Sequence, residues 1–307
     1  MRYQLVSVAL ITAVSGHGVV TSIEGANGVS MPGLSIADGT PRDCSSNRCG
    51  SQADTSIIRD REIASGEVGP LGRTEGNGPV DPAVLISSFM GGNSNVPVNN
   101  GTGTGQEDDI PNNLGQKRRR SYRRAQQQKA EHRRQIGKFL GGLLGGGGDN
   151  QGEKTEEPEE VSVAAAAGDG TASGLPTASD DGVVTLKYRQ INQDGAGPLS
   201  AAIDGTSGGS DPDAFQTAEV TQDVPGLGFG GLSLATNTDF PVTVQMPQGM
   251  TCDGSVGGAD NVCIVRVRNS AAAGPFGGSA AFTQSAAARK RAIAYRLKKR
   301  MQLDRKN

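Results

Sequence analysis

His17 is the residue of this chain best placed to bind a metal ion. It follows a basic start, an apolar run from Leu5 to Val14 and the small pair Ser15-Gly16, which is the layout of a secretory signal peptide. Cleavage after Gly16 makes residues 1–16 the signal peptide and His17 the mature N-terminus, where the α-amine and a ring nitrogen can bind one copper ion. Val14, rather than alanine, stands three residues before that cut. If cleavage falls a residue or two away, His17 is an ordinary surface residue.

The four cysteines favour disulfides. An even number of cysteines behind a signal peptide is typical of a secreted, oxidised chain. Two local loops, Cys44–Cys49 and Cys252–Cys263, are the favoured pairing among three connectivities. A zinc site is the weaker alternative, because the spacings are not CxxC pairs and the chain's other histidine is His132.

Other catalytic arrangements find little support. The chain has no GxSxG motif, and its two histidines leave almost no base for a catalytic triad. The 32 acidic residues include no pair whose spacing singles it out for glycoside hydrolysis. Asn100 begins the single N-glycosylation sequon, in a Gly/Asn/Thr-rich stretch that we expect to be exposed.

Composition and charge divide the chain. Hydrophobic residues make up 35%, 46 residues are glycine and tryptophan is absent, so much of the chain cannot contribute to a packed core. The net charge of −2 hides two basic segments, Lys117–Lys138 and Arg289–Lys306, which carry 19 of the 30 basic residues. The remainder of the chain is therefore acidic.

The elements that must position His17 are predicted strands. Runs at 17–23, 183–190, 242–246 and 262–268 are rich in β-branched residues and are bounded by turn residues, whereas Asp54–Ile63 suits one short helix. We expect an all-β, immunoglobulin-like β-sandwich with a long disordered insertion. Its parts are a first half at 17–98, the charged and Gly-rich insertion at 99–181, a second half at 182–285 and a basic, helical tail at 286–307.

Five short motifs resemble those of the Egh-like (MAS-type) fungal appressorium virulence-factor family. They lie in both predicted halves of the sandwich and in neither the insertion nor the tail. The motifs are Gly39–Asp43, Gln52–Arg59, Gln190–Pro198, Asn261–Arg266 and Ala273–Gly278. The resemblance implies a secreted or cell-surface protein linked to host penetration. Members of this family are compared with copper-dependent polysaccharide monooxygenases, whose mature chains begin with histidine. The resemblance implies no firm biochemical activity.

Two departures from the family pattern bear on that comparison. The resemblance places a second histidine where this chain has Arg189, and a guanidinium has no lone pair for copper. His132 is the other imidazole of the chain, on a segment poorly suited to hold a ligand in place. The resemblance also places cysteines at the positions of Val267 and Ser279, which implies a disulfide lost as a pair.

Three hypotheses follow for a secreted, extracellular chain. The favoured one is a non-catalytic protein that binds cell-wall polysaccharide or a host surface component, with no nucleic-acid partner and no transmembrane segment. The second is a copper-dependent polysaccharide oxidase that uses His17, with Phe276 or Tyr188 near an axial position. The third is a binder of anionic polymers through the basic segments, whose dibasic pairs also suit proteolytic processing.

Overall fold

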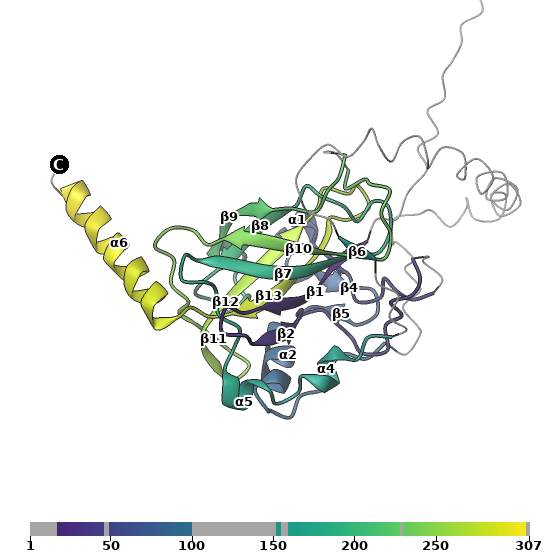
Figure 1. Ribbon diagram of the computed structural model, residues 1–307, viewed down its shortest axis with the longest axis horizontal. Coiled ribbons are helices and arrows are strands. Elements are labelled where there is room, and N and C mark those ends of the chain that lie inside the picture. Colours follow the sequence, from purple (N-terminus) through teal and green to yellow (C-terminus); the bar gives the residue numbers. More distant parts are fainter. Residues whose placement is uncertain (1–16, 46–48, 100–151, 155–158, 228–229, 305–307) are drawn as a thin grey trace, which may run out of the picture. The chain divides into compact units, whose positions relative to one another are not determined.

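A computed structural model describes residues 17–45, 49–99, 152–154, 159–227 and 230–304 of the chain (Figure 1). The predicted signal peptide (1–16), the sequon at Asn100 and His132 lie outside these residues. So does most of the predicted insertion.

The described strands form one curled antiparallel sheet, a half-barrel whose hydrogen-bonded path runs β2-β1-β7-β10-β9-β8-β12-β13-β3-β4-β5. Two further strands pair off this path, β6 with β10 and β11 with β12. The strands are β1 (Gly18–Glu24), β2 (Ser30–Pro32), β3 (Ser56–Ile57), β4 (Arg73–Thr74), β5 (Gly78–Pro79), β6 (Glu153–Lys154), β7 (Val183–Gln190), β8 (Ser200–Asp204), β9 (Phe215–Gln222), β10 (Thr238–Gln245), β11 (Gly254–Val256), β12 (Ala259–Arg268) and β13 (Phe276–Phe282).

The mostly β prediction is confirmed, and the finer prediction of an immunoglobulin-like sandwich is not established by this pairing. Two separate sheets would leave a break between the layers, whereas β9 pairs with both β8 and β10 and joins them. The predicted strand at 183–190 is β7, and those at 242–246 and 262–268 fall largely within β10 and β12.

Small residues on β13 allow β1 to pack closely against it, although these two strands do not pair. A Cβ added at Gly278 would lie 2.9 Å from the backbone nitrogen of Val20, so β1 approaches the glycine backbone closely. The amide of Leu34 also donates to the carbonyl of Ser279, at 2.9 Å. Side chains of ordinary size at these positions would hold β1 away from β13.

The core fills the space inside the curl. Large side chains that are at most 1% exposed include Ile23, Leu186, Tyr188, Ile264 and Phe282. Burying a side chain of this size stabilises a fold by about 1.5–3 kcal/mol.

Helices lie in the connections and at the C-terminus. They are α1 (Asp60–Ala64), α2 (Pro82–Phe89), α4 (Ser162–Ala165), α5 (Gly170–Ser173), a 3-10 turn at Pro212–Ala214, and α6 (Ala286–Asp304). The helix expected at Asp54–Ile63 is correct only in its last part, because Ser56–Ile57 pairs as strand β3. The tail is helical as predicted and follows β13 directly (Figure 1). No helix in the described ranges is long and apolar enough to cross a membrane.

The predicted insertion ends too late in the sequence. Residues 159–181 belong to the folded unit rather than to an excursion: Val163 is 3% exposed and Leu175 is 5% exposed. The side chain of Asn27 donates to the carbonyl of Leu175 at 3.1 Å, which fixes this segment beside the β1–β2 turn.

Candidate functional site

His17 lies buried immediately before β1. Its side chain packs on Phe276, with 4.2 Å between the ring centroids, and the residue is 1% exposed. Its backbone nitrogen donates to Oδ1 of Asn192 at 2.5 Å, and its carbonyl accepts from the amide of Ile191 at 3.0 Å. The alternative that His17 is an ordinary surface residue is therefore wrong.

The motif around Gly195 is built against this position. A Cβ at Gly195 would lie 2.1 Å from the carbonyl oxygen of His17, so only glycine allows the two backbones to approach. The buried hydroxyl of Tyr188 donates to the carbonyl of Gly195 at 3.0 Å. Burial raises the pKa of Tyr188, so this phenol stays protonated as a donor.

Asn269 joins two of the motifs. Its side-chain amide donates to the carbonyl of Asp194 at 3.0 Å, and its side-chain oxygen accepts from the amide of Phe276 at 3.0 Å. The Gln190–Pro198 and Ala273–Gly278 motifs therefore meet beside His17.

Arg189 is a buried structural cation. It lies opposite Val19 on β1 and opposite Asp239 on β10. Its Nη1 pairs with Oδ1 of Asp239 at 3.0 Å, and its Nη2 donates to the carbonyl of Arg42. A guanidinium held in this way fills the position where the family resemblance places an imidazole.

A second buried cluster surrounds Arg42. Its Nη1 and Nη2 bind the two carboxylate oxygens of Asp54, at 3.1 and 2.5 Å, and Nε and Nη2 bind Oε2 of Glu160, at 3.0 and 2.9 Å. Burial alone would lower the pKa of Arg42, but the two carboxylates outweigh it and raise that pKa. Burial likewise opposes the charge of Glu160, yet Arg42 and the Ser162 contacts hold its pKa below the ordinary value. The cluster therefore joins the segment from Arg42 to Asp54 to the distant Glu160.

Arg59 joins the Gln52–Arg59 motif to the Ala273–Gly278 motif. Its Nε donates to the carbonyl of Gly274 at 3.2 Å, Nη2 donates to the carbonyl of Ala273 at 2.9 Å, and Nη1 pairs with Glu62 at 2.9 Å. Four of the five motifs thus hold one another through buried polar side chains, and the fifth, Asn261–Arg266, lies in β12.

The described residues do not fit a copper histidine brace. A brace needs two imidazoles and the terminal amine. Arg189 pairs with Asp239, and no group of three His, Cys, Asp or Glu side chains in the described ranges could hold a metal ion. Phe276 packs on the His17 ring and Tyr188 bonds Gly195, so both have structural contacts there. His132 lies outside the described residues.

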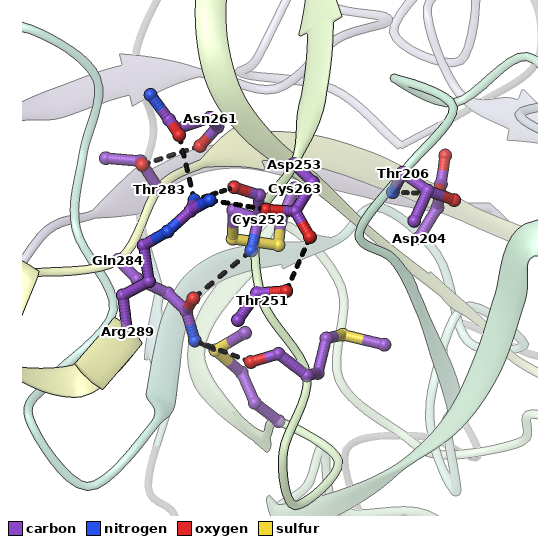
Figure 2. Close-up of a disulfide and its surroundings, with 12 residues drawn as sticks. Asp204, Thr206, Thr251, Cys252, Asp253, Asn261, Cys263, Thr283, Gln284 and Arg289 are labelled. Atoms are coloured by element: carbon purple, nitrogen blue, oxygen red, sulfur yellow. Dashed lines mark hydrogen bonds and ion pairs between the residues drawn. A yellow bond between two sulfur atoms is a disulfide. The ribbon is translucent and has the colours of Figure 1, made fainter. Parts of the chain in front are cut away.

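Both predicted disulfides are present. Cys44 pairs with Cys49, and Cys252 pairs with Cys263. Figure 2 shows the second bond beside Arg289 and Asp253.

The hypothesis that Val267 and Ser279 replace one lost disulfide is wrong. Val267 lies opposite Gly278 on the paired strands β12 and β13, and Ser279 lies opposite Arg266. Because successive side chains of a strand point to opposite faces, cysteines at these two positions would lie on different faces of the sheet.

A cavity of about 410 Å³ lies between the β4–β5 hairpin, the start of α2 and residues 95–98. No Lys, Arg or His is among the described residues that line it. The polar lining includes the exposed side chains Asn77, Asp81 and Asn95, and the buried Ser35, whose hydroxyl has no hydrogen-bond partner among the described residues. The apolar lining is Leu34, Pro79, Val80, Val84, Leu85, Val96, Pro97 and Val98.

No pattern in the sequence predicts this cavity or the Arg42 cluster. Arg42 and Glu160 are 118 positions apart, and no spacing rule joins them. The Gly39–Asp43 motif contains Arg42, but it does not indicate which residues Arg42 binds.

Comparison with known proteins relates the chain to fungal virulence factors. Residues 15–277 match the family described as Egh16-like virulence factor. The chain is 52% identical over 296 residues to the appressoria-specific virulence factor GAS2 of Pyricularia oryzae, covering 96% of this chain and 93% of that protein. It is 38% identical over 133 residues to the appressoria-specific virulence factor GAS1 of the same organism, covering 42% of this chain and 51% of that protein. No solved structure matches the chain.

Proposed function

The chain belongs to the Egh16-like virulence factor family, and from that premise we propose that it is a secreted, non-catalytic protein that binds neutral cell-wall polysaccharide. The cavity beside α2 is the binding site in this proposal. The relatives' names place them in appressoria and in virulence, and a surface-binding role agrees with both.

The lining of the cavity is the observation that carries the proposal. Its volume suits a small ligand or the end of a chain. Asn77, Asp81 and Asn95 offer amide and carboxylate groups that hydrogen-bond hydroxyls, and the valine and proline walls suit the C–H faces of a sugar ring. A ligand without negative charge fits best, because no basic side chain lines the cavity among the described residues.

Co-sedimentation of the full secreted protein with insoluble chitin, cellulose and β-glucan tests the binding. We expect retention on at least one polymer. The double variant Asn77→Ala, Asn95→Ala should weaken that binding about tenfold, because it removes two hydrogen-bonding side chains. Asn93→Ala, exposed and outside the lining, is the matched control.

The experiment tests the cavity as the binding site separately from polysaccharide as the ligand. Retention that both variants leave unchanged would move the binding away from the cavity. A protein that ignores every polymer but binds host surface extracts would replace polysaccharide with a host component.

Secretion is supported by the layout of residues 1–16 and by the two disulfides, which persist in oxidising compartments. Deleting residues 1–16 should abolish export into the medium. Unchanged export would contradict the extracellular assignment.

The proposal that the protein is non-catalytic rests on Arg189, whose guanidinium pairs with Asp239. N-terminal analysis of the secreted chain, followed by copper calorimetry, tests it. We expect no tight equimolar copper site. Tight copper binding by a chain that begins at His17, lost in His17→Ala, would restore the oxidase hypothesis.

A further inference from the structure

The C-terminal helix α6 is attached to the fold through its first turns. The Ser285 hydroxyl donates to Asp180 at 2.7 Å and accepts from the amide of Ala288 at 3.1 Å. Figure 2 shows Arg289 reaching from the helix to the disulfide region. Its Nη1 donates to the carbonyl of Cys252 at 2.6 Å, and its Nη2 pairs with Asp253 at 2.6 Å.

One face of α6 turns toward this attachment. Ala288 is 6% exposed, and a Cβ at Gly249 would lie 2.9 Å from the ring of Tyr295, so the 247–251 loop lies against that side. Arg296 donates to the hydroxyl of Thr251 at 3.2 Å from the same side.

The opposite face carries an exposed apolar stripe. Ile293, Leu297 and Met301 recur every four residues, and at 3.6 residues per turn they lie across the helix from Ala288 and Tyr295. Their exposed fractions are 39%, 53% and 60%. Nothing in the described part of the chain covers these side chains.

Basic side chains lie beside this stripe. At 3.6 residues per turn, Lys290, Lys298 and Arg300 lie within the stripe or at its edges, whereas Lys299 projects on the side of Ala288. All four side chains are exposed, and none of them makes an ion pair with another described residue. In contrast, Arg289 and Arg291 are paired with Asp253 and Asp180. The unpaired cations Lys298 and Arg300 therefore lie beside Leu297 and Met301 near the end of the helix.

We propose that α6 is a docking helix for anionic lipid surfaces. Exposed apolar side chains insert among lipid tails, and the flanking lysines and arginine bind acidic headgroups. A soluble polyanion would use the charges alone and leave the stripe in water. A second copy of the chain would bring a second set of unpaired cations against the first, which repel each other.

Flotation of the full-length protein with lipid vesicles tests this inference. We expect weak or no binding to phosphatidylcholine vesicles, and clear binding when phosphatidylserine is added, reduced by high salt. The variants Leu297→Ser with Met301→Ser, and Lys298→Gln with Arg300→Gln, should each weaken binding about tenfold. Both sets of side chains are exposed, so thermal unfolding should stay unchanged.

Leu227→Ser with Leu234→Ser is the matched control. These leucines are 51% and 74% exposed on a loop that also lies at the surface, and their loss should leave vesicle binding as it is.

Three results would overturn the proposal. The first is absence of binding to phosphatidylserine vesicles by the native chain. The second is vesicle binding that survives Leu297→Ser with Met301→Ser, accompanied by equal binding to a soluble acidic polysaccharide, which would make α6 a polyanion site. The third is a dimer in light scattering that the same double variant dissociates. This proposal does not depend on the cavity beside α2. A protein that fails to bind polysaccharide would therefore not contradict it.

Discussion

Nη2 of Arg189 donates a hydrogen bond to the backbone carbonyl of Arg42. This contact joins the β7–β10 pair, which holds Arg189 through Asp239, to the cluster in which Arg42 binds Asp54 and Glu160. The position where the family resemblance suggests a metal ligand thus helps to hold together three distant segments of the chain.

Replacing Arg42 should destabilise the fold severely. Arg42→Met leaves the carboxylate of Asp54, which is 0% exposed, without its cation. Breaking a buried pair in this way costs about 3–5 kcal/mol. Urea unfolding of the variant measures the loss, and Arg300→Met, an exposed arginine, should change stability by less than about 0.5 kcal/mol. Equal stability of Arg42→Met and the native chain would show that the cluster contributes no net stability.

Glu160 should make the stability fall in acid. Its pKa in the folded chain lies below the ordinary value of 4.5, because Arg42 and Ser162 outweigh the effect of burial. A depressed carboxyl pKa contributes stability above the unfolded pKa, and that contribution disappears as pH falls through the folded pKa. Glu160→Gln should therefore be less stable than the native chain at pH 7, and the difference should shrink as the pH falls below about 4.5.

Unfolding curves measured from pH 7 down to pH 3 check this expectation. The exposed neighbour Glu159 supplies the control, since Glu159→Gln should follow the native chain throughout. A stability difference for Glu160→Gln that stays constant across this range would contradict the linkage.

The longer strands were predictable because they are long and β-branched. The run at 183–190 coincides with β7, and its alternation shows in the burial of every second residue over its first half. Strands β3, β4 and β5 have two residues each, too few for any periodicity. They form because neighbouring strands pair with them, and a single sequence carries no sign of that.

The sequence places residues 159–181 in the predicted insertion for a related reason. Their Ala, Gly and Ser composition predicts no core. The segment is held instead by a few separated anchors, such as Glu160 on Arg42 and Val163 and Leu175 in the core. Asp38 also accepts from the amides of Val163 and Ala164, at 3.0 and 2.8 Å, across more than 120 positions.

Gly195 should tolerate no side chain. A Cβ there would lie 2.1 Å from the carbonyl oxygen of His17 and 2.6 Å from its carbonyl carbon, and backbone atoms cannot move aside cheaply. Gly195→Ala should lower the midpoint of thermal unfolding by at least 5 °C, which corresponds to about 2 kcal/mol in a domain of this size. Gly69→Ala is the matched control, because no atom lies within 4 Å of its added Cβ. A Gly195→Ala protein that melts with the native chain would mean that the His17 backbone can shift freely.

The two disulfides should differ in their contribution to stability. Their sequence separations are 11 for Cys252–Cys263 and 5 for Cys44–Cys49, and loop closure alone gives about 3 and 2 kcal/mol. Cys252 and Cys263 are also 0% exposed, whereas Cys44 and Cys49 are partly exposed. Replacing the buried pair by alanine therefore adds the loss of core packing. It also disturbs the Cys252 carbonyl that holds Arg289 of α6. Urea unfolding of the two double-alanine variants should show the larger loss for the 252–263 pair, by more than about 1 kcal/mol. An equal or reversed order would mean that the buried disulfide is not integrated with the core around it.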